Sequence, residues 1–297
     1  MTAVTDVAEN SDRHVAMKTI LLPFFDDEAS QTALGTAHLI AARFNGHIEG
    51  LFVEEIPQVI GGEGISLPAE YLTQLESERR HRANHARGRF VAYLEAKGTK
   101  VAGLGEPGDG VTGGWHEEDG QESHIVGELG RLFELIVVGR TLKHGAGGWE
   151  FTCEAALFES GRPVLLAAET VPEAIGKQVV IAWNGSTETA RTVAFAMPFL
   201  KAAERVVVLT VRGQTVPGPN GESVAEYLRR SDVDAYPVTV ETLGRQTGEA
   251  ILDETRMIGA DLLVKGAYTQ NRLRQMIFGG ATRHILSHAD LPVFMAH

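Results

Sequence analysis

The sequence predicts an α/β protein of two tandem, doubly wound domains, in which helices cover both faces of a parallel β-sheet. The first observation is an internal repeat: residues 18–53 and 177–211 share one plan of a basic start, a buried strand, a polar turn, a helix and a second buried strand. The second observation is that the apolar runs carry no alternating polar residues, which indicates strands buried on both faces. A parallel sheet between right-handed crossover helices accounts for both.

The repeat continues in the later part of each half. The segment FELIVVGR (133–140) parallels ADLLVKGA (260–267), and GRPVLLA (161–167) parallels DLPVFMA (290–296). A repeat period of about 150 residues indicates a duplicated domain, since solenoid repeats are much shorter. The boundary between the two domains is expected within 168–177, where a proline and a glycine disfavour a regular helix or strand. The predicted order is a disordered leader at 1–16, one domain at 17–168 and a second domain at 176–297.

The apolar runs and helical patterns place the main elements. Strands are predicted at 20–25, 48–53 and 135–138 in the first half, and at 179–183, 206–211 and 262–264 in the second. A long helix is predicted over 69–96, with a polar centre that faces solvent or, alternatively, a partner. The Gly-rich segment 103–120 is predicted to be a loop with one short extended piece near Trp115.

Composition limits the classes of partner. The 297 residues carry a formal net charge of −12, which argues against nucleic acid and anionic membrane surfaces. Apolar runs such as 206–211 are far shorter than the roughly 20 residues of a membrane helix. The polar start at 1–16 lacks the apolar region of a signal peptide, and the single cysteine, Cys153, fits a reducing compartment as a small buried residue. We therefore expect a cytoplasmic protein whose partners are small molecules or proteins.

The residues that follow the strands are the candidate binding residues. Ligands of open parallel sheets bind beyond the carboxyl ends of the strands, where the strand order reverses. In the second half these positions are 184–186, 211–212 and 266–269, and residues 279–282 then lead into the helical segment ATRHILSH. Backbone N–H groups at a helix start, together with a hydroxyl, favour an anion, and glycines let the main chain approach a phosphate.

With these motifs, both halves resemble the universal stress protein family, whose domains are Rossmann-like (adenine nucleotide α-hydrolase-like) with five parallel strands. The resemblance covers nearly the whole chain, and matches least around 54–66 and 103–120. In ATP-binding members the signature is Gly-x-x-Gly, nine residues, then Gly-Ser or Gly-Thr, with an Asp after the first strand. Here Gly266 and Gly279 keep the spacing. Thr269 replaces the second glycine, Gly280 replaces the Ser or Thr, and Asn184 replaces the Asp.

The resemblance implies that the second half binds ATP or another adenine nucleotide, together with Mg²⁺. The implied contacts are Ala182, Trp183, Asn184, Val211, Lys265, Gly266, Thr269, Gly279, Gly280, Ala281 and Thr282. Because three signature positions differ, a loop that only packs is the alternative. For Lys265 two interpretations stand: its ammonium group either reaches solvent beyond the sheet or supplies charge to a phosphate.

The first half is expected to serve as a structural domain. Its loop between Gly139 and Pro163 is two residues shorter than the loop between Gly266 and Pro292. Glu150, next to Trp149, stands near the expected phosphate position and would repel an anion.

Enzyme chemistry has little support in the sequence. The sequence identifies no nucleophilic residue with a paired base, so no catalytic residue is assigned. The pairs His81/His85 and His284/His288 are interpreted as histidines on helix surfaces, because neither pair has a carboxylate or thiol to complete a metal site. The acidic segment HEED (116–119) is interpreted as part of a solvated loop.

Three functions remain in competition. The first is a stress-response binding module that an adenine nucleotide regulates; the alternatives are a nucleotide-free scaffold and a slow ATPase. In the resembling family, single domains pair through their last strands, and both halves supply that strand, at 163–167 and 292–296. We therefore expect an intrachain pseudo-dimer in which these strands lie adjacent and antiparallel. A homodimer would have to use other surfaces.

Overall fold

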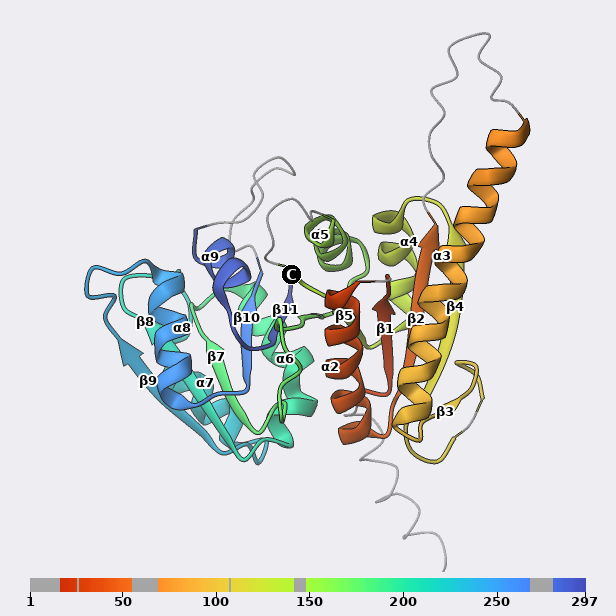
Figure 1. Ribbon diagram of the computed structural model, residues 1–297. Coiled ribbons are helices and arrows are strands. Elements are labelled where there is room, and N and C mark those ends of the chain that lie inside the picture. The colour runs from red at the N-terminus through yellow and green to blue at the C-terminus, as the bar shows by residue number, and fades with distance from the viewer. Residues whose placement is uncertain (1–16, 26, 55–68, 107, 142–147, 268–279) are drawn as a thin grey trace, which may run out of the picture.

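The computed structural model describes residues 17–25, 27–54, 69–106, 108–141, 148–267 and 280–297, which form one continuous sheet with helices on both sides (Figure 1). From one edge to the other, the strands are β3 (Lys100–Val101), β4 (Thr112–Asp119), β2 (His47–Glu54), β1 (Thr19–Pro23), β5 (Leu135–Val138), β6 (Val164–Leu166), β11 (Val293–Ala296), β10 (Leu262–Gly266), β7 (Gln178–Ala182), β8 (Arg205–Val211) and β9 (Ala235–Val240).

Each half of the sheet has the same strand order. In the second half the order is β9-β8-β7-β10-β11, and the first half repeats it as β4-β2-β1-β5-β6. All pairs within a half are parallel, and the two-residue strand β3 is added beside β4 at the edge. The predicted fold class is confirmed: each half is a doubly wound, Rossmann-like sheet of five principal strands.

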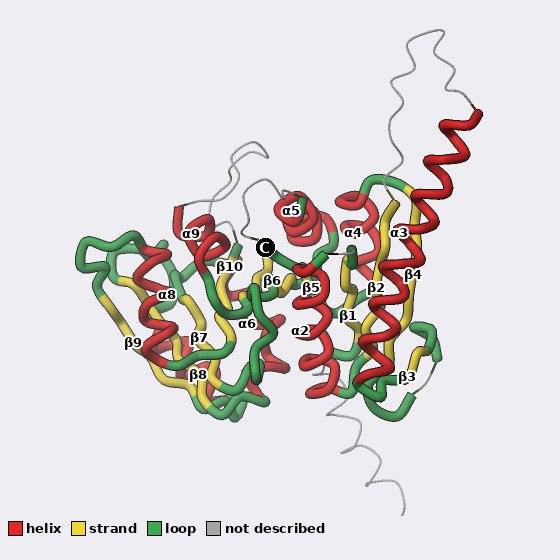
Figure 2. Tube along the Cα trace, in the orientation of Figure 1, coloured by secondary structure: helices red, strands yellow, loops and turns green. Residues whose placement is uncertain are grey.

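Helices cover the sheet in two layers, as the tube in Figure 2 shows. One layer contains α2 (Glu28–Phe44), α3 (Ala69–Ala96), α6 (Thr187–Lys201) and α7 (Gly221–Arg229), whose apolar residues form one buried cluster with the sheet. The other layer contains α4 (Glu122–Leu129), α5 (Trp149–Glu159), α8 (Thr247–Ile258) and α9 (Gly280–His288), which contribute to a second cluster on the opposite face. The short 3-10 helix η2 (Gly130–Leu132) follows α4. Within the described part of the chain, no helix is both long enough and apolar enough to cross a membrane.

The two halves join where their last strands meet. Strand β6 pairs antiparallel with β11, in a register that places Leu166 opposite Val293 and Val164 opposite Met295. All four of these side chains are buried. The predicted adjacency and antiparallel direction of these two strands are therefore confirmed. The pairing gives each half a covered edge in place of one that exposes unpaired backbone groups.

An arginine reinforces this junction from the first half. Arg43 lies in the last turn of α2, and its guanidinium donates to the carbonyl oxygens of Ile175 (3.0 Å) and Gly176 (3.2 Å). It also donates to the carbonyl oxygen of Ala202, at the C-terminal end of α6. A cation at the end of a helix satisfies carbonyl groups that have no partner within the helix.

The expectation of a loop over 103–120 is wrong for its second part. Residues 112–119 form β4, an eight-residue strand in register with the whole of β2. Gly113 and Gly114 suggested a loop, but a β-carbon at Gly113 would collide with Leu94, and one at Gly114 would collide with Glu49. Glycines inside a strand can mark such close packing instead of a turn. In contrast, the helix predicted over 69–96 is confirmed with the same bounds.

A lysine substitution at Val293 tests the junction. The charge would be buried without a partner in the β6–β11 pair, at a cost of several kcal/mol. We expect Val293→Lys to separate the halves, which would raise the radius of gyration in X-ray scattering and expose apolar surface to a hydrophobic dye. Met257→Lys, at an exposed position of α8, is the control. A Val293→Lys protein that is as compact as the parent and binds no more of the dye would show that the junction lies elsewhere.

Candidate functional site

The strand order creates one ligand-binding position in each half. In the second half β7 lies between β8 and β10, and the chain leaves β7 and β10 toward helices on opposite faces. The carboxyl ends of these two strands therefore flank the crevice at which open α/β sheets bind ligands. In the first half, β1 and β5 flank the corresponding crevice.

In the second half, the start of α6 packs tightly against the end of β10. A β-carbon at Gly266 would lie only 2.6 Å from both the backbone nitrogen and the Oγ1 of Thr189. Ser186 is the N-cap of α6, and its hydroxyl accepts from the Thr189 N–H at 3.2 Å. Gly266 is thus needed because no side chain fits between the strand and the helix.

Asn184 fixes the turn between β7 and α6. Its Oδ1 accepts from the Thr189 hydroxyl at 2.7 Å and from the Ser186 N–H at 3.2 Å. The next residue, Gly185, has a φ of 83°, and a β-carbon there would lie 2.7 Å from the carbonyl oxygen of Val216. At the position where the resembling family has its nucleotide-contacting Asp, this chain therefore has a side chain that organises the helix start.

Lys265 is buried at the end of β10, so the interpretation in which its ammonium group reaches solvent is wrong. The residue is 6% exposed, and its Nζ donates to the Oγ1 of Thr282 at 2.9 Å and to the carbonyl oxygen of Gly266 at 2.6 Å. Among the described residues, no carboxylate lies within ion-pair distance of Nζ. Burial lowers the pKa of Lys265 from 10.5 to about 8.

Thr282 comes from the first turn of α9, a helix with no acidic residue in that turn. Its side chain is buried against Lys265, whereas Gly280 is exposed and Ala281 is half-buried. The structure thus brings Lys265 and Thr282 together beside Gly266. Two other predicted phosphate contacts, Thr269 and Gly279, lie outside the described residues.

The predicted adenine contacts lie at the ends of β7 and β8. Ala182 pairs with Lys265 in the β7–β10 register, and both Ala182 and Val211 are buried on the face covered by α8 and α9. Trp183 belongs to the cluster on the opposite face, where its Nε1 donates to the carbonyl oxygen of Pro219 at 2.8 Å. The position of an adenine among these residues stays a prediction.

Helix α9 is held at its C-terminal end by a residue of the first half. Arg140 lies two residues after the end of β5 and is only 2% exposed. Its guanidinium donates to the carbonyl oxygen of Leu286 at 2.8 Å and to that of Ala289. Because these carbonyls belong to the last turn of α9 and the residue after it, the arginine meets the negative end of the helix dipole.

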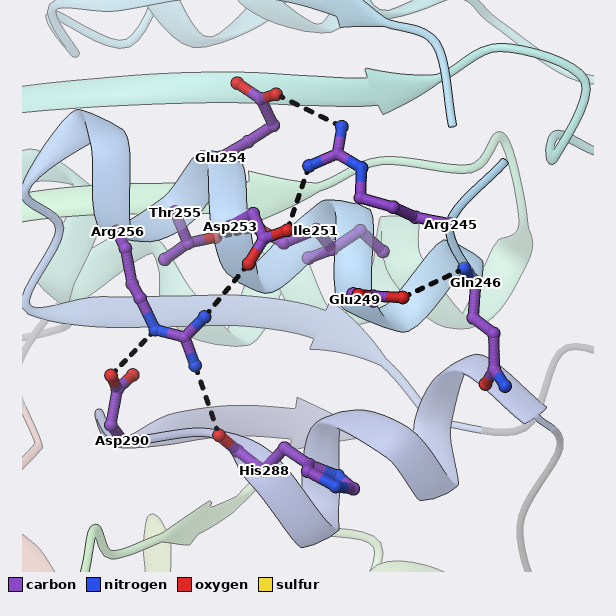
Figure 3. Close-up of polar contacts among 10 residues, drawn as sticks. All are labelled: Arg245, Gln246, Glu249, Ile251, Asp253, Glu254, Thr255, Arg256, His288 and Asp290. Carbon is purple, nitrogen blue, oxygen red and sulfur yellow. Dashed lines mark hydrogen bonds and ion pairs between the residues drawn. The ribbon is translucent and has the colours of Figure 1, made fainter. Parts of the chain in front are cut away.

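A second arginine holds α9 from its own half (Figure 3). Arg256 on α8 donates through Nε to Asp290 at 2.8 Å and through Nη2 to the carbonyl oxygen of His288 at 3.4 Å. Arg256 also contacts Asp253, one turn away on its own helix, at 3.1 Å. The two arginines together position α9 and, with it, Thr282 at the opposite end of the helix.

The first half contains a hollow of about 340 Å³ at its own crevice. Its walls include Pro23 and Phe25 at the end of β1 and Val138 and Gly139 at the end of β5. The remaining lining residues come from the starts of three helices and from a nearby loop: Asp27, Ala29, Ser30, Glu122, Thr141, Gly148, Trp149 and Thr152.

Glu122 was not among the predicted residues, because a glutamate at the start of α4 belongs to no recognisable motif. It accepts from the Thr152 hydroxyl at 2.6 Å and thereby links α4 to α5. The internal repeat could have identified Phe25 as a residue of this crevice, because Phe25 occupies the position that Asn184 has in the second half.

None of the remaining candidates is among the lining residues of the first-half hollow. His81 and His85 stack on α3, and His284 and His288 stack on α9. Residues 116–119 belong to the exposed end of β4, so their assignment to a loop is wrong. Cys153 is buried as predicted, and burial raises the pKa of its thiol to about 12.

Fold and crevice together define a Rossmann-like α/β domain pair of the type that binds ligands beyond its strand ends. Residues 176–297 match the model of the universal stress protein family. Universal stress protein Slr1230 of Synechocystis sp. is 23% identical over 93% of this chain and 99% of its own length. Stress response protein NhaX of Bacillus subtilis is 32% identical over 56 residues, 19% of this chain and 34% of that protein.

Solved structures extend the likeness to the whole fold. A universal stress protein from Archaeoglobus fulgidus superposes with a TM-score of 0.71 at 17% identity, covering 95% of this chain and 97% of that one. The functionally unknown protein PA1789 from Pseudomonas aeruginosa gives a TM-score of 0.52 at 15% identity, covering 96% and 94%. Residues 176–297 therefore belong to the universal stress protein family, and the chain as a whole shares the fold of such a protein.

The buried ammonium group of Lys265 predicts a specific pH dependence of stability. Its pKa is lower in the folded protein than its ordinary value of 10.5, so the unfolded chain binds more protons between pH 8 and 10.5. The contribution of Lys265 to stability must therefore rise with pH across that range. We expect the free energy of unfolding of the wild type, relative to Lys265→Met, to increase by roughly 1–3 kcal/mol from pH 7 to pH 10. Urea denaturation of both proteins at pH 7 and pH 10 measures this difference in the free energy of unfolding.

Lys100→Met, at an exposed position of β3, is the control for general effects of losing a lysine charge. If the wild type and Lys265→Met change in parallel with pH, as the wild type and Lys100→Met should, Lys265 is not buried as a charged group.

Proposed function

We propose that the second half binds an adenine nucleotide, with its phosphates beside Lys265, Gly266 and the start of α9. The observation that carries the proposal is the buried ammonium group of Lys265, which touches Thr282 and has no carboxylate partner among the described residues. A buried charge without a counter-ion destabilises the folded state. A bound phosphate would supply that counter-ion.

The start of α9 adds a second attraction for an anion. The N-terminus of a helix presents unpaired N–H groups and roughly half a positive charge. The first turn of α9 holds no acidic residue that would offset it, and the Thr282 hydroxyl can turn from Lys265 to a phosphate oxygen. The retained spacing from Gly266 to Gly279 agrees with this position of the phosphates.

The remaining predicted contacts complete the proposed nucleotide site. The adenine would lie near Ala182, Trp183, Asn184 and Val211, with Thr269, Gly279, Gly280 and Ala281 near the phosphates. Mg²⁺ would arrive bound to the phosphates, because no cluster of His, Cys, Asp or Glu among the described residues is arranged to hold a metal ion.

The biological role that fits such a site is a stress-response module whose state depends on nucleotide occupancy. We infer a cytoplasmic, tandem protein with domains at 17–168 and 176–297, in which β6–β11 pairing makes an intrachain pseudo-dimer. The stress-response names of its Synechocystis and Bacillus subtilis relatives support the role. A nucleotide-free scaffold is the second candidate, because Asn184 already uses its side-chain oxygen to organise α6.

Hydrogen exchange with and without ATP tests the site in solution. We expect ATP to protect the start of α9 and the ends of β7 and β10, and to leave the first half unchanged. Lys265→Met should weaken ATP binding at least tenfold in calorimetry, since a charge-assisted bond to phosphate contributes roughly 1.5–3 kcal/mol. Affinity should also fall as the pH rises through about 8, the pKa at which Lys265 loses its charge.

Lys100→Met should bind ATP like the wild type. Equal protection of both halves, or none at millimolar ATP, would contradict the placement and favour the nucleotide-free scaffold. Sustained phosphate release that Thr282→Ala abolishes would instead indicate a slow ATPase.

A further inference from the structure

We propose that the hollow in the first half binds a small organic cation: an ammonium group attached to an apolar body. The hollow occupies the crevice between β1 and β5, and its volume of about 340 Å³ lies within the range of small-molecule sites. Two of its lining residues are carboxylates, Asp27 and Glu122, and two are aromatic, Phe25 and Trp149. The described lining contains no lysine, arginine or histidine.

Equivalent positions of the two halves have opposite character. Val138 lines the hollow at the end of β5, where the repeat places Lys265 at the end of β10. The N-cap of the following helix changes in the same direction, because Asp27 caps α2 in the first half, whereas the uncharged Ser186 caps α6 in the second. Among the described residues, the first crevice therefore has a valine where the second has a lysine, and a carboxylate where the second has a hydroxyl.

The helix N-termini around the hollow bring partial positive charges, but each of them also carries a carboxylate. The N-termini of α2, α4 and α5 contribute roughly half a positive charge each. Carboxylates occupy the same ends: Asp27 and Glu28 at α2, Glu122 at α4 and Glu150 at α5. These carboxylates offset the partial positive charges of the helix starts, so the described walls of this crevice suit a cation better than a phosphate.

The carboxylates and rings suit an ammonium ligand in particular. One carboxylate oxygen of Asp27 accepts a hydrogen bond from the Ser30 N–H at 2.7 Å. One carboxylate oxygen of Glu122 accepts from the Thr152 hydroxyl at 2.6 Å. A carboxylate can accept several hydrogen bonds, so each of these side chains can accept a further donor beside the one named. Aromatic rings attract cations through their faces, and the Trp149 ring is fixed by its bond from Nε1 to the Thr141 carbonyl oxygen at 3.1 Å.

The arginine that follows the lining residue Gly139 in sequence makes its contacts elsewhere. Arg140 follows the lining residue Gly139 directly, but its guanidinium is buried against the carbonyl oxygens at the end of α9. It therefore cannot serve as an anion-binding group for the hollow without breaking the contact between the halves.

Calorimetric titration of the full chain with three ligands of similar shape tests the proposal. The probes are 2-phenylethylamine, protonated at neutral pH, the neutral 2-phenylethanol and the anionic phenylacetate. We expect the amine to bind at least tenfold more tightly than either of the others. Hydrogen exchange should show that the amine protects the starts of α2 and α5.

Two substitutions remove charge while keeping the local hydrogen bonds. Asparagine caps a helix about as well as aspartate, and glutamine retains the oxygen that Thr152 requires. Asp27→Asn and Glu122→Gln should each weaken amine binding roughly five- to tenfold, and the double variant should weaken it further. Glu188→Gln, in the first turn of α6 in the second half, should leave it unchanged.

The proposal would be overturned by equal affinity for the amine and the alcohol, by tighter binding of phenylacetate, or by amine binding that neither neutralising substitution weakens. Lys143 and His144 lie in 142–147, outside the described residues. Anion binding that Lys143→Ala/His144→Ala abolishes would show that these residues outweigh the carboxylates, which also contradicts the proposal. Failure here leaves the nucleotide site untouched, because that site uses different residues.

Discussion

The antiparallel pairing of β6 with β11 is the interaction on which the rest of the structure depends. It joins two parallel half-sheets into one sheet and covers the edge that each half would otherwise expose. The same junction brings Arg140 of the first half to the end of α9. Since the start of α9 carries Thr282 and touches Lys265, the geometry of the proposed nucleotide site depends on a contact between the halves.

The two halves share a strand order, but the residues at their crevices differ. Both crevices keep a glycine at the strand end that no larger residue can replace: Gly139 lies against the backbone of Ala29, and Gly266 lies against Thr189. The backbone of the two sites is thus shared, whereas the charged side chains differ. One strand carries a lysine at its carboxyl end and the other a valine, and in our proposals this difference sets the sign of the ligand that each crevice binds.

The sequence was sufficient for the fold because its signals are periodic and repeated. Buried strands without polar alternation and an internal repeat predicted the fold class, and a long helix was predicted over 69–96. The resemblance to a known family predicted the junction of the two last strands. Glycines misled the prediction at β4, where Gly113 and Gly114 allow close packing inside a strand. The site was less predictable, because the burial of Lys265 and the approach of Glu122 to Thr152 depend on contacts between residues far apart in the chain. No local pattern encodes such contacts.

The central claim is that one chain holds two crevices of opposite charge preference. Native mass spectrometry of the intact protein, mixed with ATP and 2-phenylethylamine together, tests this most directly because it counts each ligand per chain. The account predicts a complex with one nucleotide and one amine bound at the same time. A chain that binds two nucleotides, or on which either ligand displaces the other, would contradict it.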